Sequence, residues 1–357
     1  KTVGDEGIIG NEKGDKSPYS GWYAPGVNIH RSPFGGRNFE YFSEDPFLAG
    51  RMGGAWVHGV QEKNVGTSLK HYLANNQEYI RMTIDSIVDE RTLREIYMPA
   101  FEHIVKAEKP TTVMCSYNRL NGTYLSDNKR FLNDVLRDEW GYDGIVVSDW
   151  GAVNDRAEGV KAGMDLEMPG SKGCGLNGDT VYKALEAGTL TEEDIDKDVL
   201  RLIRFAYENT VREVEGVTFD VEKHNDIARR AAEGGAVLLK NDGILPLNKK
   251  QSIAVVGRLA KQIRYQGGGS SHILPTKLTS FTDALDKVGQ EYTYSDGYVL
   301  KGEGYKKSLI KKAVKAAKGK DVVLLFVGLT DAFESEGYDR HHIKMPSSHV
   351  TLINEIL

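Results

Sequence analysis

Short apolar runs alternate with amphipathic stretches along the first part of the chain. The runs GTSLKH (66–71), TTVMCSYN (111–118) and GIVVSDWG (144–151) have the length and β-branched content of buried strands. Weaker strand patterns lie at 26–31 and 163–170. Helical spacing of apolar residues occurs at 46–63, 90–109, 128–141 and 196–210. This alternation of strand and helix predicts a parallel sheet with crossover helices.

Polar side chains collect where each predicted strand ends. They are Asn28, His30, Lys70, His71, Ser116, Asn118, Asp149, Asp165 and Glu167. In a parallel barrel the functional groups gather at the carboxyl ends of the strands. We therefore expect residues 1–210 to form a domain resembling a (β/α)8 TIM barrel. Because the five predicted strands fall short of eight, we expect this barrel to be incomplete at its N-terminus.

A charged stretch separates this region from a second α/β pattern. We interpret residues 211–224 as a linker and residues 225–357 as an α/β sandwich. The sandwich is predicted from a helix running into a strand at 225–241, a buried strand at 252–258, and a helix at 307–320 that leads into a strand at 321–329. The last residues, VTLINEIL, have the pattern of a helix cut short, so we expect the sandwich to be truncated at its C-terminus.

Composition narrows the class of protein. The chain has 357 residues, of which 40% are hydrophobic and 27% charged, and its net charge is −5 with both signs well mixed. This balance argues against a nucleic-acid partner, and no apolar run approaches the roughly 20 residues of a membrane helix. Only Cys115 and Cys174 occur, which excludes a disulfide framework and favours the cytoplasm of a bacterium over secretion.

Asp149 is the first candidate for a catalytic residue. Placing a carboxylate at the end of an apolar strand costs free energy, so we expect a functional reason for it. One interpretation is a helix N-cap, since Asp between a strand and a helix commonly caps the first turn. The other is a nucleophile or base on a barrel rim. Trp150 follows it, and its ring could form an apolar platform for the C–H face of a sugar.

Other candidates carry hydrogen-bond donors or acids, and each has a structural alternative. Lys70, His71 and Arg81 can donate to hydroxyl groups, but a strand would point Lys70 and His71 to opposite faces. Tyr117 could hydrogen-bond the Asp149 carboxylate or be a surface tyrosine. Arg37 could be solvated or form a buried pair with Glu40 or Glu44.

A charged loop after the predicted strand 321–329 is the candidate in the second domain. In ESEGYDR one of the glutamates, Glu334 or Glu336, is a candidate general acid, although a charged loop at a strand end is equally compatible with plain surface. No His/Cys set has the spacing of a structural zinc site. The glycine-rich stretch YQGGGSSH (265–272) fits no phosphate-binding pattern, so we expect neither metal nor cofactor.

Taken together, the motifs resemble the β-glucosidase branch of glycoside hydrolase family 3. They are APGVNIHRSPFGGRNFEYFSEDP, KHYLANNQE with a following Arg, MCSYN, VVSDWGA and GLTDAFESEGYDR, in this order. The resemblance implies an N-terminal barrel-like domain followed by an α/β sandwich, with the active site between them. It also implies that Asp149 is the nucleophile and that Glu336 is the acid/base, with Glu334 as the alternative.

The resemblance assigns further residues to the first sugar subsite. These are Arg37, Lys70, His71, Arg81, Met114 and Tyr117, with Trp150 at its border and Ser270 approaching from the second domain. A retaining glycosidase of this kind holds its two carboxyl groups about 5–5.5 Å apart. We expect Lys70 and Arg81 to favour the ionised form of Asp149.

Departures from other branches of the family sharpen the expected substrate. Members acting on N-acetylglucosaminides carry a KHFPGHG-like stretch where this chain has KHYLANNQE. Xylosidase-like members tend to have a small residue where this chain has Trp150. The sequence thus predicts a retaining, exo-acting β-glucosidase that removes terminal β-D-glucosyl residues from glucosides or oligosaccharides.

Two alternatives stay open: a β-xylosidase or dual-specificity exo-glycosidase, and a catalytically silent sugar-binding protein. A homo-oligomer is possible, whereas neither nucleic acid nor membrane is an expected partner. We expect residues outside this chain to supply the remaining barrel and sandwich segments.

Overall fold

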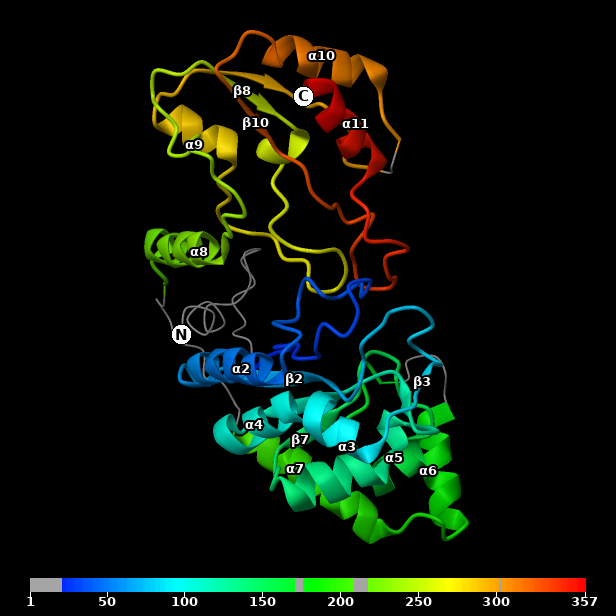
Figure 1. Ribbon diagram of the computed structural model, residues 1–357. Coiled ribbons are helices and arrows are strands. Elements are labelled where there is room, and N and C mark those ends of the chain that lie inside the picture. Colours follow the sequence, from blue (N-terminus) through cyan, green and yellow to red (C-terminus); the bar gives the residue numbers. More distant parts are fainter. Residues whose placement is uncertain (1–20, 171–175, 209–217, 302–303) are drawn as a thin grey trace. The chain divides into compact units, whose positions relative to one another are not determined.

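The chain forms two compact units, Lys1–Phe219 and Asp220–Leu357 (Figure 1). The computed structural model describes residues 21–170, 176–208, 218–301 and 304–357. The division lies inside the predicted linker 211–224, of which residues 211–217 are outside the described residues. Helix α8 (Val221–Gly235) begins before that linker was expected to end, because the Asp220 side chain accepts a hydrogen bond from the Lys223 N–H and caps it.

The first unit is organised on a four-stranded parallel sheet. Its strand order is β1 (Gly21–Trp22), β2 (Gly66–Tyr72), β4 (Thr112–Cys115) and β7 (Ile145–Val147). The predicted strands at 66–71, 111–118 and 144–151 correspond to β2, β4 and β7. The described residues form four strands in this sheet and two further parallel bridges, so the predicted incomplete (β/α)8 barrel is not confirmed by the strand pairing.

The two weaker strand predictions, at 26–31 and 163–170, are wrong as continuous elements. Each segment contributes a single parallel bridge, Gly26 with Lys70 and Leu166 with Val147. At the first segment the reason is a side chain: Asn28 donates to the His71 carbonyl at 3.0 Å and accepts from the His71 N–H at 2.9 Å. The amide thus takes the backbone groups that a continuing ladder would use.

Helices connect the strands of this unit. They are α2 (Pro46–Gln61), α3 (Glu90–Thr92), the π-helix η1 (Leu93–Tyr97), α4 (Pro99–Glu108), the π-helix η3 (Arg130–Glu139), α5 (Arg156–Ala162), α6 (Leu176–Glu186) and α7 (Glu192–Glu208). The single helix predicted at 90–109 is divided, because Pro99 has no N–H to continue the hydrogen-bond ladder and starts a new helix. A small sheet of β3 (Asp85–Ser86), β5 (Arg119–Leu120) and β6 (Thr123–Tyr124) and the 3-10 turn η2 (Leu125–Asp127) lie among the loops.

The strand alternation separates two apolar clusters in this unit. Leu69, Val113, Cys115 and Val146 pack with Phe101 and Ile104 of α4 and with residues of η3. Met114, Ile145 and Val147 pack on the opposite face with Leu202 and Phe205 of α7. Burying a side chain such as Leu or Phe stabilises the fold by about 1.5–3 kcal/mol each. Both faces of the sheet are therefore covered, and functional groups are left to the strand ends.

The second unit is a parallel sheet with helices on both faces. Its strand order is β10 (Val322–Leu325), β8 (Ile253–Val256) and β9 (Tyr292–Ser295). Ala254 and Val256 pack against α10 (Lys307–Ala317) and α11 (Ser347–Ile356), and Ile253 and Val255 pack against α9 (Phe281–Lys287). The 3-10 turn η4 (Arg258–Ala260) follows β8. Strands β8 and β10 and helix α10 fall where the sequence predicted them, whereas β9 and α9 were missed.

The strand expected at the end of 225–241 is wrong. The helix α8 ends at Gly235, and Leu239 in the following apolar stretch is 92% exposed and belongs to no strand. A strand requires a partner as well as an apolar pattern, and a short apolar run does not identify one.

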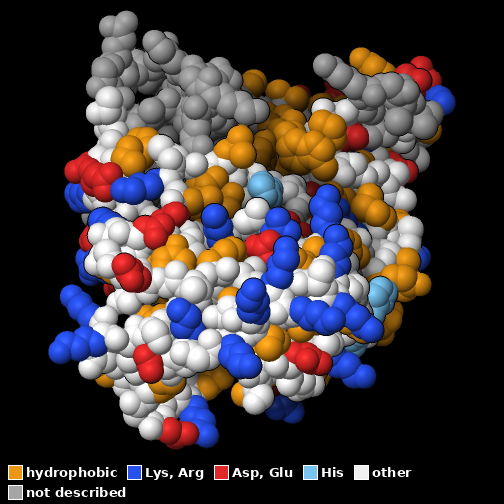
Figure 2. Space-filling model, turned by 90° about the horizontal axis from the view of Figure 1, so that it is seen from above, with side chains coloured by type: hydrophobic (Ala, Val, Ile, Leu, Met, Phe, Trp, Pro, Cys, Tyr) orange, Lys and Arg blue, Asp and Glu red, His pale blue; other side chains and the backbone are white. Residues whose placement is uncertain are grey.

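The surface carries mixed charge. Lys and Arg side chains are spread over the face shown in Figure 2, and exposed lysines follow one another along α10.

Candidate active site

Asp149 lies two residues beyond the end of β7, at the carboxyl edge of the first sheet. It is 8% exposed, and its N–H donates to the Cys115 carbonyl of the neighbouring strand at 3.2 Å. The Trp150 N–H donates to Oδ1 at 2.7 Å, whereas Oδ2 has no hydrogen-bond partner among the described residues and lies 3.6 Å from His71 Nε2. One carboxyl oxygen is therefore fixed by the backbone and the other faces a polar site.

The charge state of Asp149 reflects opposing influences. Burial raises the pKa of this carboxyl, while the hydrogen bond from the Trp150 N–H, the charges of Arg37 and Lys70 and the Tyr117 hydroxyl lower it. The net direction is upward. Lys70 thus lowers the Asp149 pKa as expected, and Arg37, for which the sequence suggested no such effect, lowers it as well.

His71 presents a neutral ring to this carboxylate. Its pKa is held well below the usual value by burial and by the charges of Arg37, Lys70 and Arg81. Nδ1 lies 3.2 Å from the Tyr41 hydroxyl. A neutral ring facing a carboxylate carries its proton on Nε2, so Tyr41 donates to Nδ1 and fixes both the tautomer and the ring orientation.

Arg37 and Lys70 share one counter-ion. Arg37, which is 3% exposed, donates through Nε to Glu40 Oε1 at 2.5 Å, and Lys70 Nζ lies 4.0 Å from Glu40 Oε2. The buried pair with Glu40 that the sequence left open is therefore present. Consecutive residues of a regular strand point to opposite faces, so Lys70 and His71 can reach one ligand only if the strand bends at its end. The strand register shifts between Leu69 and Tyr72, and both Lys70 and His71 act on Asp149.

Arg81 is held by Glu78 and Tyr117. Its Nη1 lies 2.7 Å from Oε2 of the buried Glu78, and its guanidinium carbon lies 4.7 Å from the centre of the Tyr117 ring. A cation over an aromatic face is attracted to the ring and keeps it in place. Arg81 therefore acts on Asp149 indirectly. It holds the Tyr117 ring, and the Tyr117 hydroxyl forms a hydrogen bond with the Asp149 carboxyl.

Trp150 and Met114 lie at different depths. Trp150 is 47% exposed, and Tyr23 packs against it edge-to-face with ring centres 5.5 Å apart. Met114 is buried in the apolar cluster with Ile145 and Val147, one residue along β4 from Cys115. The half-exposed indole offers an apolar surface beside the carboxylate, as its position next to Asp149 suggested.

In the second unit the two candidate glutamates have different environments. Glu336 Oε2 accepts a hydrogen bond from the Ser270 N–H at 2.7 Å, and the Glu336 N–H donates to the Gly268 carbonyl at 3.0 Å. Glu334 Oε2 instead lies 2.9 Å from Arg264 Nη2. Glu334 is thus committed to an ion pair, and Glu336 is the glutamate held by the glycine-rich loop.

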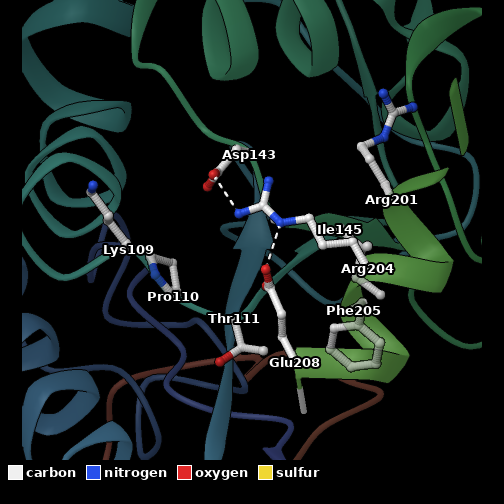
Figure 3. Close-up of a pocket in the computed structure, with 10 residues that line it drawn as sticks. Lys109, Pro110, Thr111, Asp143, Ile145, Arg201, Arg204, Phe205 and Glu208 are labelled. Atoms are coloured by element: carbon white, nitrogen blue, oxygen red, sulfur yellow. Dashed lines mark hydrogen bonds and ion pairs between the residues drawn. The ribbon is translucent and has the colours of Figure 1, made fainter.

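A cavity of about 200 Å³ opens at the other end of the first sheet and serves a different purpose (Figure 3). Gly144 and Ile145 line it at the start of β7, the end opposite to Asp149. Its Arg204 is already bound to Asp143 at 2.9 Å and to Glu208 at 2.8 Å (Figure 3). Arg204 is thus paired with both acids that line this cavity, Asp143 and Glu208.

Within the described residues, no cluster of three or more His, Cys, Asp or Glu side chains is arranged to hold a metal ion. In the same part of the chain no helix has the length and apolarity required to cross a bilayer. Cys115 is a buried free thiol, and Cys174 lies outside the described residues.

Sequence reasoning missed several residues that complete this arrangement. Tyr41, Glu78 and Arg264 orient the residues that were predicted, and Tyr23 packs on Trp150. Signals existed for Tyr41, which lies in the same NFEYF stretch as Glu40, and for Glu78, which ends KHYLANNQE three residues before Arg81. Tyr23 and Arg264 are far in sequence from the groups they contact.

Known proteins share both parts of this architecture. The family description "Glycosyl hydrolase family 3 N terminal domain" matches residues 20–205, and "Glycosyl hydrolase family 3 C-terminal domain" matches residues 236–357. The crystal structure of a GH3 beta-glucosidase from Bifidobacterium adolescentis superposes with a TM-score of 0.90 at 46% identity, covering 99% of this chain and 51% of that one.

Curated relatives point in the same direction. Thermostable beta-glucosidase B of Acetivibrio thermocellus is 48% identical over 336 residues, which is 93% of this chain and 44% of the relative. Exo-alpha-(1->6)-L-arabinopyranosidase of Bifidobacterium longum is 48% identical over 343 residues, covering 93% of this chain and 45% of the relative. The chain thus spans a little under half the length of these relatives. Since the two family descriptions together account for most of its residues, the chain belongs to glycosyl hydrolase family 3.

Proposed function

We propose that this chain carries the catalytic residues of a retaining exo-β-glucosidase. The observation that supports it best is the Asp149 carboxyl, which is buried, fixed through Oδ1 by a backbone N–H and left without a hydrogen bond at Oδ2 among the described residues, close to donors for sugar hydroxyls. A carboxylate that attacks an anomeric carbon needs one oxygen held still while the other is not tied up in a hydrogen bond. We assign the nucleophile to Asp149 on this ground.

The acid/base is assigned to Glu336. A general acid must carry a proton in the first step and take one up from water in the second. Glu334 is engaged by the guanidinium of Arg264, which stabilises a carboxylate and opposes protonation. Glu336 is held by two backbone groups, the Ser270 N–H and the Gly268 carbonyl, and is half-buried.

Substrate contacts follow from the donors around Asp149. We propose that Arg37, Lys70, His71 and Arg81 bind the hydroxyls of the sugar in the first subsite, and that Trp150 offers its exposed face to the ring. Met114 and Tyr117 would line that subsite, and Ser270 would orient the acid/base. Hydrogen bonds to sugar hydroxyls that tighten in the transition state contribute several kcal/mol in such enzymes.

Under this proposal the first unit is a (β/α)8 barrel and the second an α/β sandwich.

A second candidate substrate class is a pentopyranoside. Identity to a named arabinopyranosidase equals identity to a named β-glucosidase, at 48% each. A glucosyl ring differs from a xylopyranosyl ring by a hydroxymethyl group, and from an α-L-arabinopyranosyl ring by that group and by the configuration at C4. A subsite discriminates between them only if it contacts these groups.

The test measures kcat/KM of the intact protein for aryl β-D-glucoside, β-D-xyloside and α-L-arabinopyranoside, and follows the anomer released by proton NMR. We expect the β-glucoside to be preferred by about tenfold or more, with β-glucose as the first product. Initial release of the α-anomer would contradict the double displacement. Glucose binding by calorimetry without turnover of any of the three would support the silent sugar-binding protein instead.

A further inference from the structure

The stretch that carries Glu336 is tied to the glycine-rich loop at two separate points. Both segments leave the sheet of the second unit in the same direction, the loop following η4 and the loop following β10 (Figure 1). One tie runs through backbone groups near Glu336. The other runs through a single side chain, Arg264, at the beginning of the glycine-rich loop.

Arg264 contacts three points on the loop that follows β10. Nη2 lies 2.9 Å from Glu334 Oε2, Nη1 donates to the Leu329 carbonyl at 3.4 Å, and Nε lies 3.9 Å from Asp331 Oδ1. The side chains of Arg264 and Glu334 are only 21% and 16% exposed. A planar guanidinium with fixed donor directions sets the relative position of such acceptors more strictly than a point charge does.

The backbone tie is close to the carboxyl group but weak on its own. Gly268 forms a parallel bridge with Ser335, and the Ser270 N–H reaches Glu336. Glycines lose more conformational freedom on ordering than any other residue, so a glycine-rich loop holds a position only when something else restrains it. The contacts of Arg264 with the loop after β10 supply this restraint. They lie on the N-terminal side of Gly268 in one segment and of Glu336 in the other.

We propose that Arg264 is a positioning residue for the acid/base, with Glu334 as its counter-ion. The proposal rests on the assignment of Glu336 as the acid/base. Arg264 fixes residues 329–334, and this holds Glu336 against Gly268 and Ser270. The proposal also assigns a role to the other glutamate of ESEGYDR: Glu334 supplies the nearest carboxylate to a guanidinium that is mostly buried.

The test compares leaving groups in the intact protein. Release of dinitrophenol needs no proton from the acid, whereas release of an alkyl alcohol does. We expect Arg264→Ala to lower kcat/KM about 30-fold for an alkyl β-glucoside and about threefold for the dinitrophenyl β-glucoside. Both losses are smaller than the roughly 10²–10⁴-fold that a general acid contributes, because the acid is displaced and not removed. Glu334→Gln should show the same selectivity with a smaller loss, and Arg264→Lys should recover part of it.

Two reference variants separate the possible outcomes. Lys261→Ala removes a cation from the same loop. Lys261 lies 5.7 Å from the Tyr294 ring and forms no hydrogen bond or ion pair with residues 329–336, all of which the structure describes, so we expect no selectivity. Glu336→Ala reports on the proposed function itself. If Glu336→Ala shows no leaving-group selectivity, the assignment of the acid/base fails, whatever Arg264 does.

Hydrogen exchange supplies a measurement that does not depend on activity. In Arg264→Ala the amides of Ser270 and Glu336 should exchange at least about tenfold faster, while those of β8 keep their protection. Equal loss for both leaving groups together with unchanged exchange at these two amides would overturn the proposal. Faster exchange over the whole unit would also overturn it, because Arg264 would then stabilise only the fold.

Discussion

The surroundings of Asp149 and of Glu336 differ in what holds the carboxyl group. At Asp149 the support comes from buried side chains of several elements: Arg37, Lys70, His71 and Tyr117 all influence its carboxyl group. At Glu336 it comes from the backbone of a glycine-rich loop, with Arg264 behind it.

The difference matches what the two proposed roles require. A nucleophile must stay ionised in a partly buried place, which calls for nearby cations and donors. An acid/base must exchange its proton twice in each cycle, so a cation against it would be harmful. Substitutions at Asp149 should therefore act through charge, and substitutions around Glu336 should act through position.

The largest effect is expected for Asp149→Asn. The amide keeps the shape but cannot form the glycosyl ester, so kcat for an aryl β-glucoside should fall about 10⁴-fold or more, as for other nucleophile losses. The melting temperature should stay the same or rise, because a buried carboxylate has been removed. Retained turnover, measured on protein with an unchanged melting temperature, would remove Asp149 from this role.

The next effect is positional and concerns Gly269. Its φ is +112°, and an added Cβ would lie 2.4 Å from the Glu336 Cβ, so Gly269→Ala should displace the acid/base and lower kcat about 100-fold. Gly337→Ala is the matched variant, since φ is +98° there but no atom lies within 4 Å. It should reduce only stability, by about 1 kcal/mol. Similar activities for the two variants would mean that the close approach to Glu336 is unimportant.

A smaller effect is expected on pH dependence. The charge of Lys70 lowers the Asp149 pKa, so Lys70→Met should raise that pKa further. Asp149 would then be protonated at a higher pH as the solution is acidified, and the acidic limb of kcat/KM should move up by about half to one unit. The rate below that limb would fall by up to about tenfold relative to the plateau.

The exposed Lys129 provides the reference for this profile. Lys129→Met should leave the limb where it is, since distant surface charges are screened by salt. A limb that does not move in Lys70→Met, or that moves to lower pH, would show that Asp149 is not the group that titrates.

The smallest effect is expected for Tyr41→Phe. Loss of the hydroxyl leaves His71 Nδ1 without its donor, and one neutral hydrogen bond is worth about 1 kcal/mol, or about fivefold in kcat/KM. Tyr142→Phe removes a comparable buried hydroxyl that donates to the Ile145 carbonyl, away from Asp149. It should change the melting temperature and not kcat/KM; equal losses of activity would assign Tyr41 to the fold alone.

The sequence determined much of the scaffold and of the candidate list. Strands β2, β4, β7, β8 and β10 could be predicted because each is a short apolar run bounded by polar residues. Asp149 could be singled out because an acid directly after such a run is unfavourable without a purpose. Two α/β patterns separated by a charged stretch likewise indicated two units before any coordinates were known.

Only the tertiary structure determined which side chains form ion pairs with one another and which segments pair as strands. Arg37 with Glu40 was one of several pairings open to the sequence, and the ion pair of Glu334 with Arg264 could not be predicted from it. The segment at 26–31 formed only one bridge because the Asn28 side chain takes the His71 backbone groups, and the segment at 236–241 found no strand partner among the described residues. The physical reason is common to all these cases. An apolar period depends on neighbours along the chain, whereas ion pairs, strand pairing and the state of a buried acid depend on groups that only folding brings together.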